Sequence, residues 1–104
     1  MIAEFRKTDK LERLGMKLVS CESMEIEYVC EDGLVHQYNS QREKSAEKLS
    51  SGDRIVATNM VGEDWKAMYA EFDRFRSGGA GEEIKLEVVK GIVLASFWLQ
   101  FNII

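Results

Sequence analysis

Apolar and polar residues alternate along several short stretches of the chain, as they do in half-buried β-strands. The alternation is clearest in residues 82–90, where Ile84, Leu86 and Val88 are separated by Lys85 and Glu87. Strand-like runs also occupy 16–21, 24–30, 34–39 and 53–59, and a further strand precedes the polar loop that follows Phe5. Because Glu31-Asp32-Gly33 supplies turn residues, we expect 24–30 and 34–39 to form a hairpin.

Two segments predict helices. Residues 65–76 place Trp65, Met68, Tyr69, Phe72 and Phe75 on or beside one stripe, with Asp64 as the cap and the turn Ser-Gly-Gly-Ala-Gly at 77–81 ending the helix. Residues 40–49 are rich in helix-forming residues, and Ser40 is available as a cap. We therefore expect a second, short and mostly solvated helix there.

Composition indicates one domain without an active site. A chain of 104 residues has room for one core, and its formal charge of -4 favours neither nucleic acid nor anionic lipid. Cys21 and Cys30 have no CxxC spacing, and His36 is the single histidine. We therefore expect no metal site, no cofactor and no catalytic residue. The few cysteines and the charged N-terminal segment favour a cytoplasmic protein.

The last fourteen residues, 91–104, form an apolar C-terminal tail without a charged side chain. As a helix they would reach about 21 Å, which is shorter than the roughly 30 Å hydrocarbon core of a bilayer. Three interpretations remain open: a docked strand or helix, a membrane-contacting end, and a peptide that enters the groove of a neighbouring molecule. The last would place Ile104 in a binding site and cause self-association through the tail.

Two motifs point to a known family. The segment Arg13-Leu14-Gly15-Met16 opens the second predicted strand, and "LSSGDRIVATN" at 49–59 opens a later one. In this order and separation they resemble the motifs of a PDZ domain, over roughly residues 3–90. The resemblance implies an α+β, mainly β fold: a PDZ-like domain at 1–90, built as a partly open β-sandwich or barrel of five to six strands capped by two helices.

The resemblance also implies a peptide-binding site. The amides of Leu14, Gly15 and Met16 would meet a peptide's terminal carboxylate, which Arg13 would help to attract. Leu14, Met16 and Leu18 would line the pocket for the last side chain. The strand that pairs with the peptide would continue through Lys17, Leu18 and Val19.

The register of the helix decides which side chains face the peptide. With Asp64 as the cap, Trp65 and Tyr69 would face the groove, and Phe72 would close the floor of the terminal pocket. A later register would place Met68 and Phe72 in the groove, and Trp65 also fits plain core packing. With Trp65 at the helix start, we expect an apolar ligand residue two positions before the end.

The resulting functional expectation is a protein–protein interaction module of the adaptor or scaffold type. It would bind the free C-terminus of a protein partner with an apolar last residue, by strand addition beside the last helix. The alternative is a regulatory or structural PDZ-like domain with a blocked groove, attached to an enzyme or membrane partner through its apolar tail.

Overall fold

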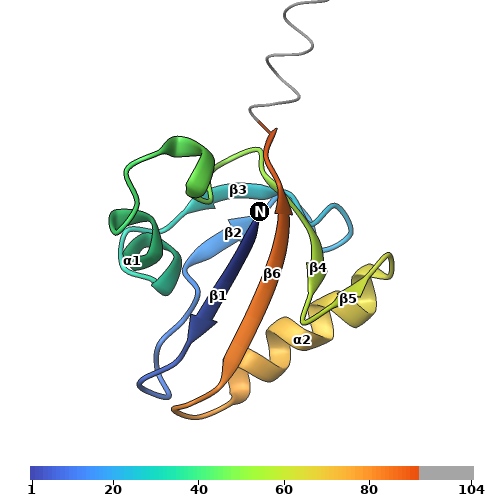
Figure 1. The fold of residues 1–104 in the computed structure, drawn as a ribbon. Helices are drawn as coiled ribbons and strands as arrows, with labels where there is room; N and C mark the ends of the chain where they lie inside the picture. Colours follow the sequence, from blue (N-terminus) through green and yellow to red (C-terminus); the bar gives the residue numbers. More distant parts are fainter. Residues whose placement is uncertain (92–104) are drawn as a thin grey trace, which may run out of the picture.

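The computed structural model describes residues 1–91, which form an α+β domain built mainly of antiparallel strands (Figure 1). A four-stranded sheet has the order β1-β6-β4-β5, and a two-stranded sheet pairs β2 with β3. The strands are β1 (Ile2–Arg6), β2 (Met16–Leu18), β3 (Ile26–Val29), β4 (Arg54–Thr58), β5 (Val61–Gly62) and β6 (Glu83–Val89). The helices are α1 (Leu34–Ser40) and α2 (Trp65–Ser77), with a 3-10 turn η1 (Ser45–Glu47) between α1 and β4.

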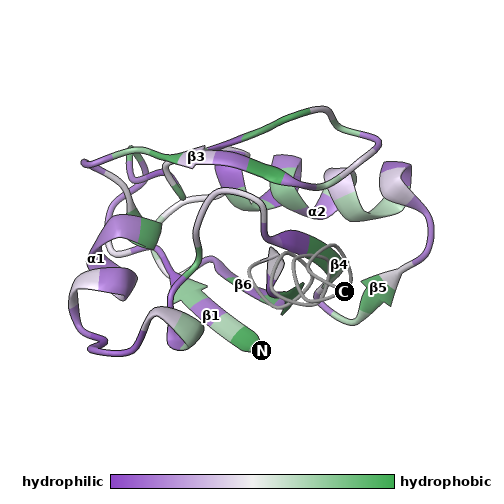
Figure 2. Ribbon diagram, turned by 90° about the horizontal axis from the view of Figure 1, so that it is seen from above, coloured by the Kyte–Doolittle hydropathy of each residue, from purple (hydrophilic) through white to green (hydrophobic). Residues whose placement is uncertain are grey.

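Hydrogen bonds connect the two sheets near the start of β4. The amide of Ile26 donates to Asp53 at 2.8 Å, and the amide of Ile55 donates to Met24 at 2.9 Å. The start of β3 is therefore hydrogen-bonded to the start of β4. Strand β2, by contrast, pairs with no strand other than β3 within residues 1–91. Figures 1 and 2 show α1 and α2 on opposite sides of the strands.

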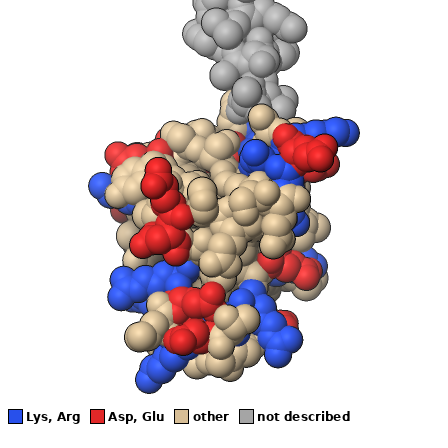
Figure 3. Space-filling view, turned by 90° about the vertical axis from the view of Figure 1, so that its left-hand side faces the viewer, with Lys and Arg blue, Asp and Glu red and all other residues tan. Residues whose placement is uncertain are grey.

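The core is where the inward faces of the sheets and helices meet. In β6 the predicted alternation is confirmed, because Ile84, Leu86 and Val88 are all buried. The buried cluster also takes side chains from the other elements, namely Ala3, Phe5, Met24, Ile26, Leu34, Val35, Leu49, Ile55, Met68 and Phe75. On the face shown in Figure 3, acidic and basic side chains are interspersed around uncharged surface.

The predicted capped helix is confirmed. The Asp64 carboxylate accepts a hydrogen bond from the amide of Lys66 at 3.0 Å, and Trp65 is the first helical residue. The helix ends at Ser77, where the predicted turn begins. Met68 and Phe75 are buried, and the Thr58 hydroxyl of β4 donates to the carbonyl of Met68. These contacts fix the rotation of α2 against the four-stranded sheet.

The prediction for residues 34–49 is wrong. Residues 34–39 belong to helix α1 rather than to a strand, and the predicted helix at 40–49 is replaced by the single turn η1. In a six-residue window, Leu34, His36 and Tyr38 fit strand alternation, but Leu34, Val35 and Tyr38 fit a helical face equally well. Tertiary contacts decide for the helix, because Leu34 and Val35 are buried and their amides find acceptors in the loop before β2. The hairpin is formed by β2 and β3 instead.

Two buried charged residues hold loops to the sheets. The Asp53 carboxylate of the "LSSGDR" stretch accepts from the amides of Ser50 and Gly91, at 2.9 and 3.0 Å, and pairs with the ammonium group of Lys90. Lys7 follows β1 and is 1% exposed. Its ammonium group donates to the carbonyls of Phe75, Arg76 and Gly78 at 2.8, 2.9 and 2.8 Å. Lys7 therefore satisfies the C-terminal carbonyls of α2 and complements the negative end of its dipole.

Residues 92–104, which hold most of the apolar tail, lie outside the described residues. Within residues 1–91, neither α1 nor α2 is long and apolar enough to cross a membrane.

The Lys7 contacts predict a specific loss of stability. Lys7→Met keeps an unbranched apolar stem but leaves three helix-terminal carbonyls without their charged donor. We expect the free energy of unfolding to fall by about 2–4 kcal/mol, measured by urea denaturation. Lys10→Met, at an exposed loop position, is the matched control and should change it by less than about 0.5 kcal/mol. Equal stabilities of the two variants would contradict this role of Lys7.

Candidate functional site

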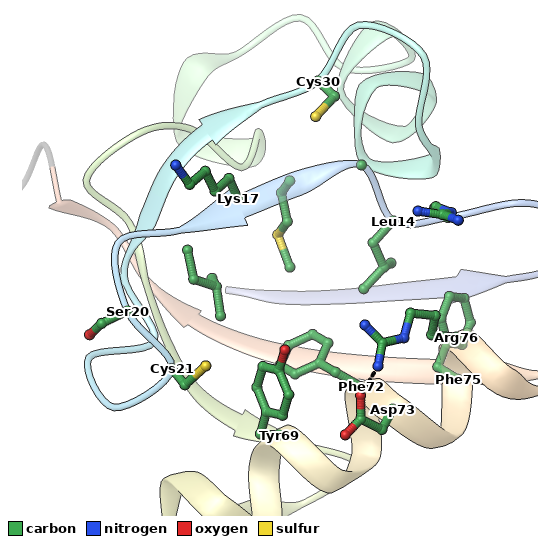
Figure 4. A pocket seen from close by; sticks show the side chains of 14 residues that line it. Leu14, Lys17, Ser20, Cys21, Cys30, Tyr69, Phe72, Asp73, Phe75 and Arg76 are labelled. Carbon is green, nitrogen blue, oxygen red and sulfur yellow. Dashed lines mark hydrogen bonds and ion pairs between the residues drawn. The ribbon is translucent and has the colours of Figure 1, made fainter.

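A cavity of about 510 Å³ lies between strand β2, the loop before it and helix α2 (Figure 4). We call it the β2–α2 groove. On the strand side it is lined by Arg13, Leu14, Gly15, Met16, Lys17, Leu18, Ser20, Cys21 and Cys30. On the helix side it is lined by Tyr69, Phe72, Asp73, Phe75 and Arg76.

Two glycines set the position of the loop before β2. A Cβ atom on Gly33 would lie 2.5 Å from the Gly15 Cα and 2.5 Å from the Leu14 carbonyl oxygen, so only glycine fits there. Gly15 is similarly enclosed, and its φ of +74° is in the left-handed region that favours glycine. The two backbones therefore touch, and the loop lies directly on the N-terminus of α1.

Hydrogen bonds fix the direction of the loop's peptide groups. The carbonyls of Arg13 and Leu14 accept from the amides of Leu34 and Val35, both at 2.9 Å. The Gly15 carbonyl accepts from the amide of Cys30 at 2.8 Å. Three successive carbonyls thus point toward α1 and the end of β3.

The amides of the same peptide groups point the other way. In a trans peptide the carbonyl and the following N–H are opposed, and no cis peptide occurs in the described chain. The N–H groups of Leu14, Gly15 and Met16 are therefore directed away from α1 and β3, on the side where the groove lies. Within residues 1–91, the amides of Leu14 and Gly15 donate no hydrogen bond. Successive amides that face one side of a loop can bind an anionic oxygen.

The pairing of β2 leaves one edge of this strand open. Antiparallel pairs alternate between residues that exchange hydrogen bonds and residues that turn their N–H and C=O outward. Because Cys30 donates to Gly15 and Val19 donates to Glu25, Met16 and Leu18 are the outward-facing residues. A bulge between Lys17 and Leu18 preserves this arrangement along the short strand. The main chain of β2 can therefore accept a further strand on its α2 side.

Helix α2 supplies the opposite wall. Tyr69, Phe72, Asp73 and Arg76 follow the i, i+3, i+4, i+7 spacing of one helical face. In Figure 4 the side chains of Tyr69 and Phe72 face strand β2 across the groove, and Phe75 and Arg76 lie below Leu14. Leu14, Met16, Leu18, Tyr69 and Phe72 are partly buried and pack against the core, so the floor of the groove is apolar.

Charged groups lie at the rim of the groove. Arg76 pairs with Asp73 within α2, and Lys17 pairs with Glu27 of β3 at 3.2 Å. Arg13 also lines the groove, and it forms no ion pair with an acidic residue among residues 1–91. Arg13 is therefore the lining cation that has no acidic partner within the described residues.

Most of the residues expected from the sequence come together here. The segment from Arg13 to Leu18 lines the groove, as do Tyr69 and Phe72. Trp65 and Val19 are not among the lining residues: Trp65 packs partly buried against the core, and Val19 is 54% exposed beyond the end of β2. Met68, which the later helix register would place in the groove, is buried in the core instead.

Sequence reasoning missed six lining residues. Asp73 and Arg76 continue the helical spacing from Tyr69 and could have been found from it. Phe75 is a core residue whose ring also reaches the cavity, while Ser20, Cys21 and Cys30 depend on the path of the β2–β3 hairpin. No local sequence pattern predicts the path of this hairpin.

Within residues 1–91, the pKa values of Glu12, Glu71 and Arg74 are shifted, and these three side chains lie outside the groove. Hydrogen bonds from Thr8 lower the pKa of the exposed Glu12 carboxyl in the loop before β2. The hydrogen bond from Arg74 lowers the pKa of Glu71 and raises that of Arg74, on the side of α2 away from the groove. These pKa shifts therefore concern ion pairs and hydrogen bonds of the loop and of the helix surface, and not the lining of the groove.

Within the described part of the chain, no group of three or more His, Cys, Asp or Glu side chains is arranged to hold a metal ion. The groove offers backbone amides, an open strand edge and an apolar floor. This arrangement can hold an extended chain with a terminal anion.

Comparison with known protein families finds no family model that matches this chain, and a search of curated proteins finds no similar sequence.

The contact between Gly33 and the loop before β2 predicts a loss of stability when Gly33 is substituted. Gly33→Ala would force the α1 N-terminus away from the loop, because its Cβ meets backbone atoms that cannot move independently. We expect a loss of about 2–4 kcal/mol in the free energy of unfolding. Gly79→Ala is the matched control, since a Cβ there meets nothing within 4 Å. If urea denaturation shows that Gly33→Ala is as stable as Gly79→Ala, the contact does not constrain the loop.

Proposed function

We propose that this chain is a PDZ-like interaction module that binds the free C-terminus of a protein partner. The peptide adds as an antiparallel strand to the outer edge of β2, and its terminal carboxylate meets the amides of Leu14, Gly15 and Met16. The observation that carries the proposal is the set of three loop carbonyls held on one side, which turns the three amides toward an open cavity.

The same geometry supports an apolar last residue in the ligand. Leu14, Met16, Leu18 and Phe72 give the groove an apolar lining. Burial of one aliphatic side chain there contributes about 1.5–3 kcal/mol. Main-chain pairing with Met16 and Leu18 supplies further affinity that does not depend on sequence.

The residue two positions before the ligand's end would lie farther along α2. The structure lines this part of the groove with Tyr69 and, on the hairpin side, Ser20 and Cys21, whereas Trp65 packs against the core. The selectivity proposed for this position therefore depends on the Tyr69 ring rather than on Trp65.

Calorimetry with short peptides tests the function. A peptide with a C-terminal isoleucine and a free carboxylate should bind with a Kd on the order of micromolar, because few residues are held and ordering them has a cost. The same peptide with an amidated end should bind at least about tenfold more weakly, since it cannot offer an anion to the three amides. Equal affinities of the two peptides would contradict the proposal.

A pair of helix variants locates the binding site. Phe72→Ala removes a ring from the floor of the groove and should weaken binding by about tenfold, measured by the same calorimetry. Lys66→Ala, at an exposed position of α2 outside the groove, should leave the affinity unchanged. Unchanged binding by Phe72→Ala would place the ligand elsewhere.

A further inference from the structure

Strand β1 presents a second open edge, and none of its residues lines the β2–α2 groove. It is the first strand of the four-stranded sheet and pairs with β6 alone within residues 1–91 (Figure 1). Unpaired strand edges are templates for pairing with another chain unless something covers them.

The hydrogen bonds of β1 identify the free groups. Met1 and Val88 exchange two bonds at 2.7 and 2.8 Å, and Lys7 donates to Glu82 at 2.9 Å. With this register, the odd-numbered residues bond to β6, and Ile2, Glu4 and Arg6 turn their N–H and C=O outward. None of these three amides donates to another described residue. The amide of Thr8 donates to Glu12, so the free edge ends at Arg6.

The side chains of the same three residues are exposed, whereas Ala3 and Phe5 are buried. Glu4 and Arg6 carry opposite charges two positions apart on one face. When two copies of β1 pair antiparallel about a twofold axis through Phe5, Glu4 of each copy lies opposite Arg6 of the other. Both residues are outward-facing in the hydrogen-bond pattern, so four main-chain bonds and two charge pairs form together.

The neighbouring register is unfavourable. An axis through Glu4 would also align outward-facing residues, but it places the two Glu4 side chains directly opposite each other. Between these two registers, the charge pattern therefore favours the pairing about Phe5. This is the self-complementarity that an isologous interface requires.

We propose that the β1 edge is a self-association surface, and that its occupant is the β1 strand of a second copy of this chain. The two four-stranded sheets join into one continuous sheet of eight strands. The edge is short, so the dimer is weak and forms at high protein concentration. The β2–α2 groove stays open in both copies, because β2 takes no part in the contact.

Charge reversal tests the pairing in the full chain. Sedimentation velocity from about 10 µM to about 1 mM should show the average mass rising above that of one chain. Glu4→Arg and Arg6→Glu should each shift the association to at least fivefold higher concentration, because each places like charges opposite each other. The double variant E4R/R6E should restore association toward that of the unchanged chain.

The double variant is a demanding test of the pairing, because each reversed side chain also faces a residue of like charge on β6 in the same chain. Glu4 lies across from Lys85, and Arg6 lies across from Glu83. Thermal unfolding and peptide binding, measured on every variant, report whether the fold and the groove are intact. Rescue by E4R/R6E despite its internal repulsion supports the pairing.

Three outcomes would overturn the proposal. The first is a single-chain mass over the whole concentration range. The second is association that neither single reversal weakens, or that the double reversal fails to restore while the variants remain folded. The third is association that a C-terminal peptide abolishes, because this would indicate a chain end in the groove of a neighbouring copy.

Discussion

The contact between Gly15 and Gly33 is the constraint on which the rest of the site depends. It lets two backbones meet without side chains between them, so the α1 N-terminus can take the carbonyls of Arg13 and Leu14. These two hydrogen bonds satisfy the amides of Leu34 and Val35, which would otherwise be buried without acceptors. It also turns the loop amides outward, toward the groove. The close approach of Gly15 and Gly33 thus explains both how the N-terminus of α1 is stabilised and why the loop amides face the groove.

Helix α2 must be placed with equal accuracy, because it forms the other wall. Asp64 fixes its first turn, Met68 and Phe75 fix its rotation, and Lys7, which follows β1, donates to the carbonyls at its C-terminal end. The helix is therefore held to β4 by the bond between Thr58 and Met68 and to the end of β1 by Lys7, rather than to β2. The groove between them stays free of the main-chain bonds that would close it.

The extent to which sequence predicted this structure follows from how local each signal is. The alternation of Ile84, Leu86 and Val88, the Asp64 cap and the stripe of α2 are local, and they predicted β6 and α2 correctly. Residues 34–39 fit strand and helix periods alike, and the hydrogen bonds of Leu34 and Val35 with Arg13 and Leu14, 21 residues earlier, favour the helix. The contributions of Cys21 and Cys30 to the groove depend on the fold of the hairpin, which no short pattern encodes. The segment from Arg13 to Leu18, which the resemblance singled out, lines the groove, and Gly15 within it has the positive φ that favours glycine.

The central claim is that the amides of Leu14, Gly15 and Met16 receive a carboxylate at the end of an extended chain. An amide-resolved NMR titration with a free-carboxylate peptide measures this most directly. The account predicts that the largest shifts occur at these three amides, with smaller shifts at Leu18, and that amidation of the peptide removes the shifts of the three. Shifts confined to other surfaces, or unaffected by amidation, would contradict the account.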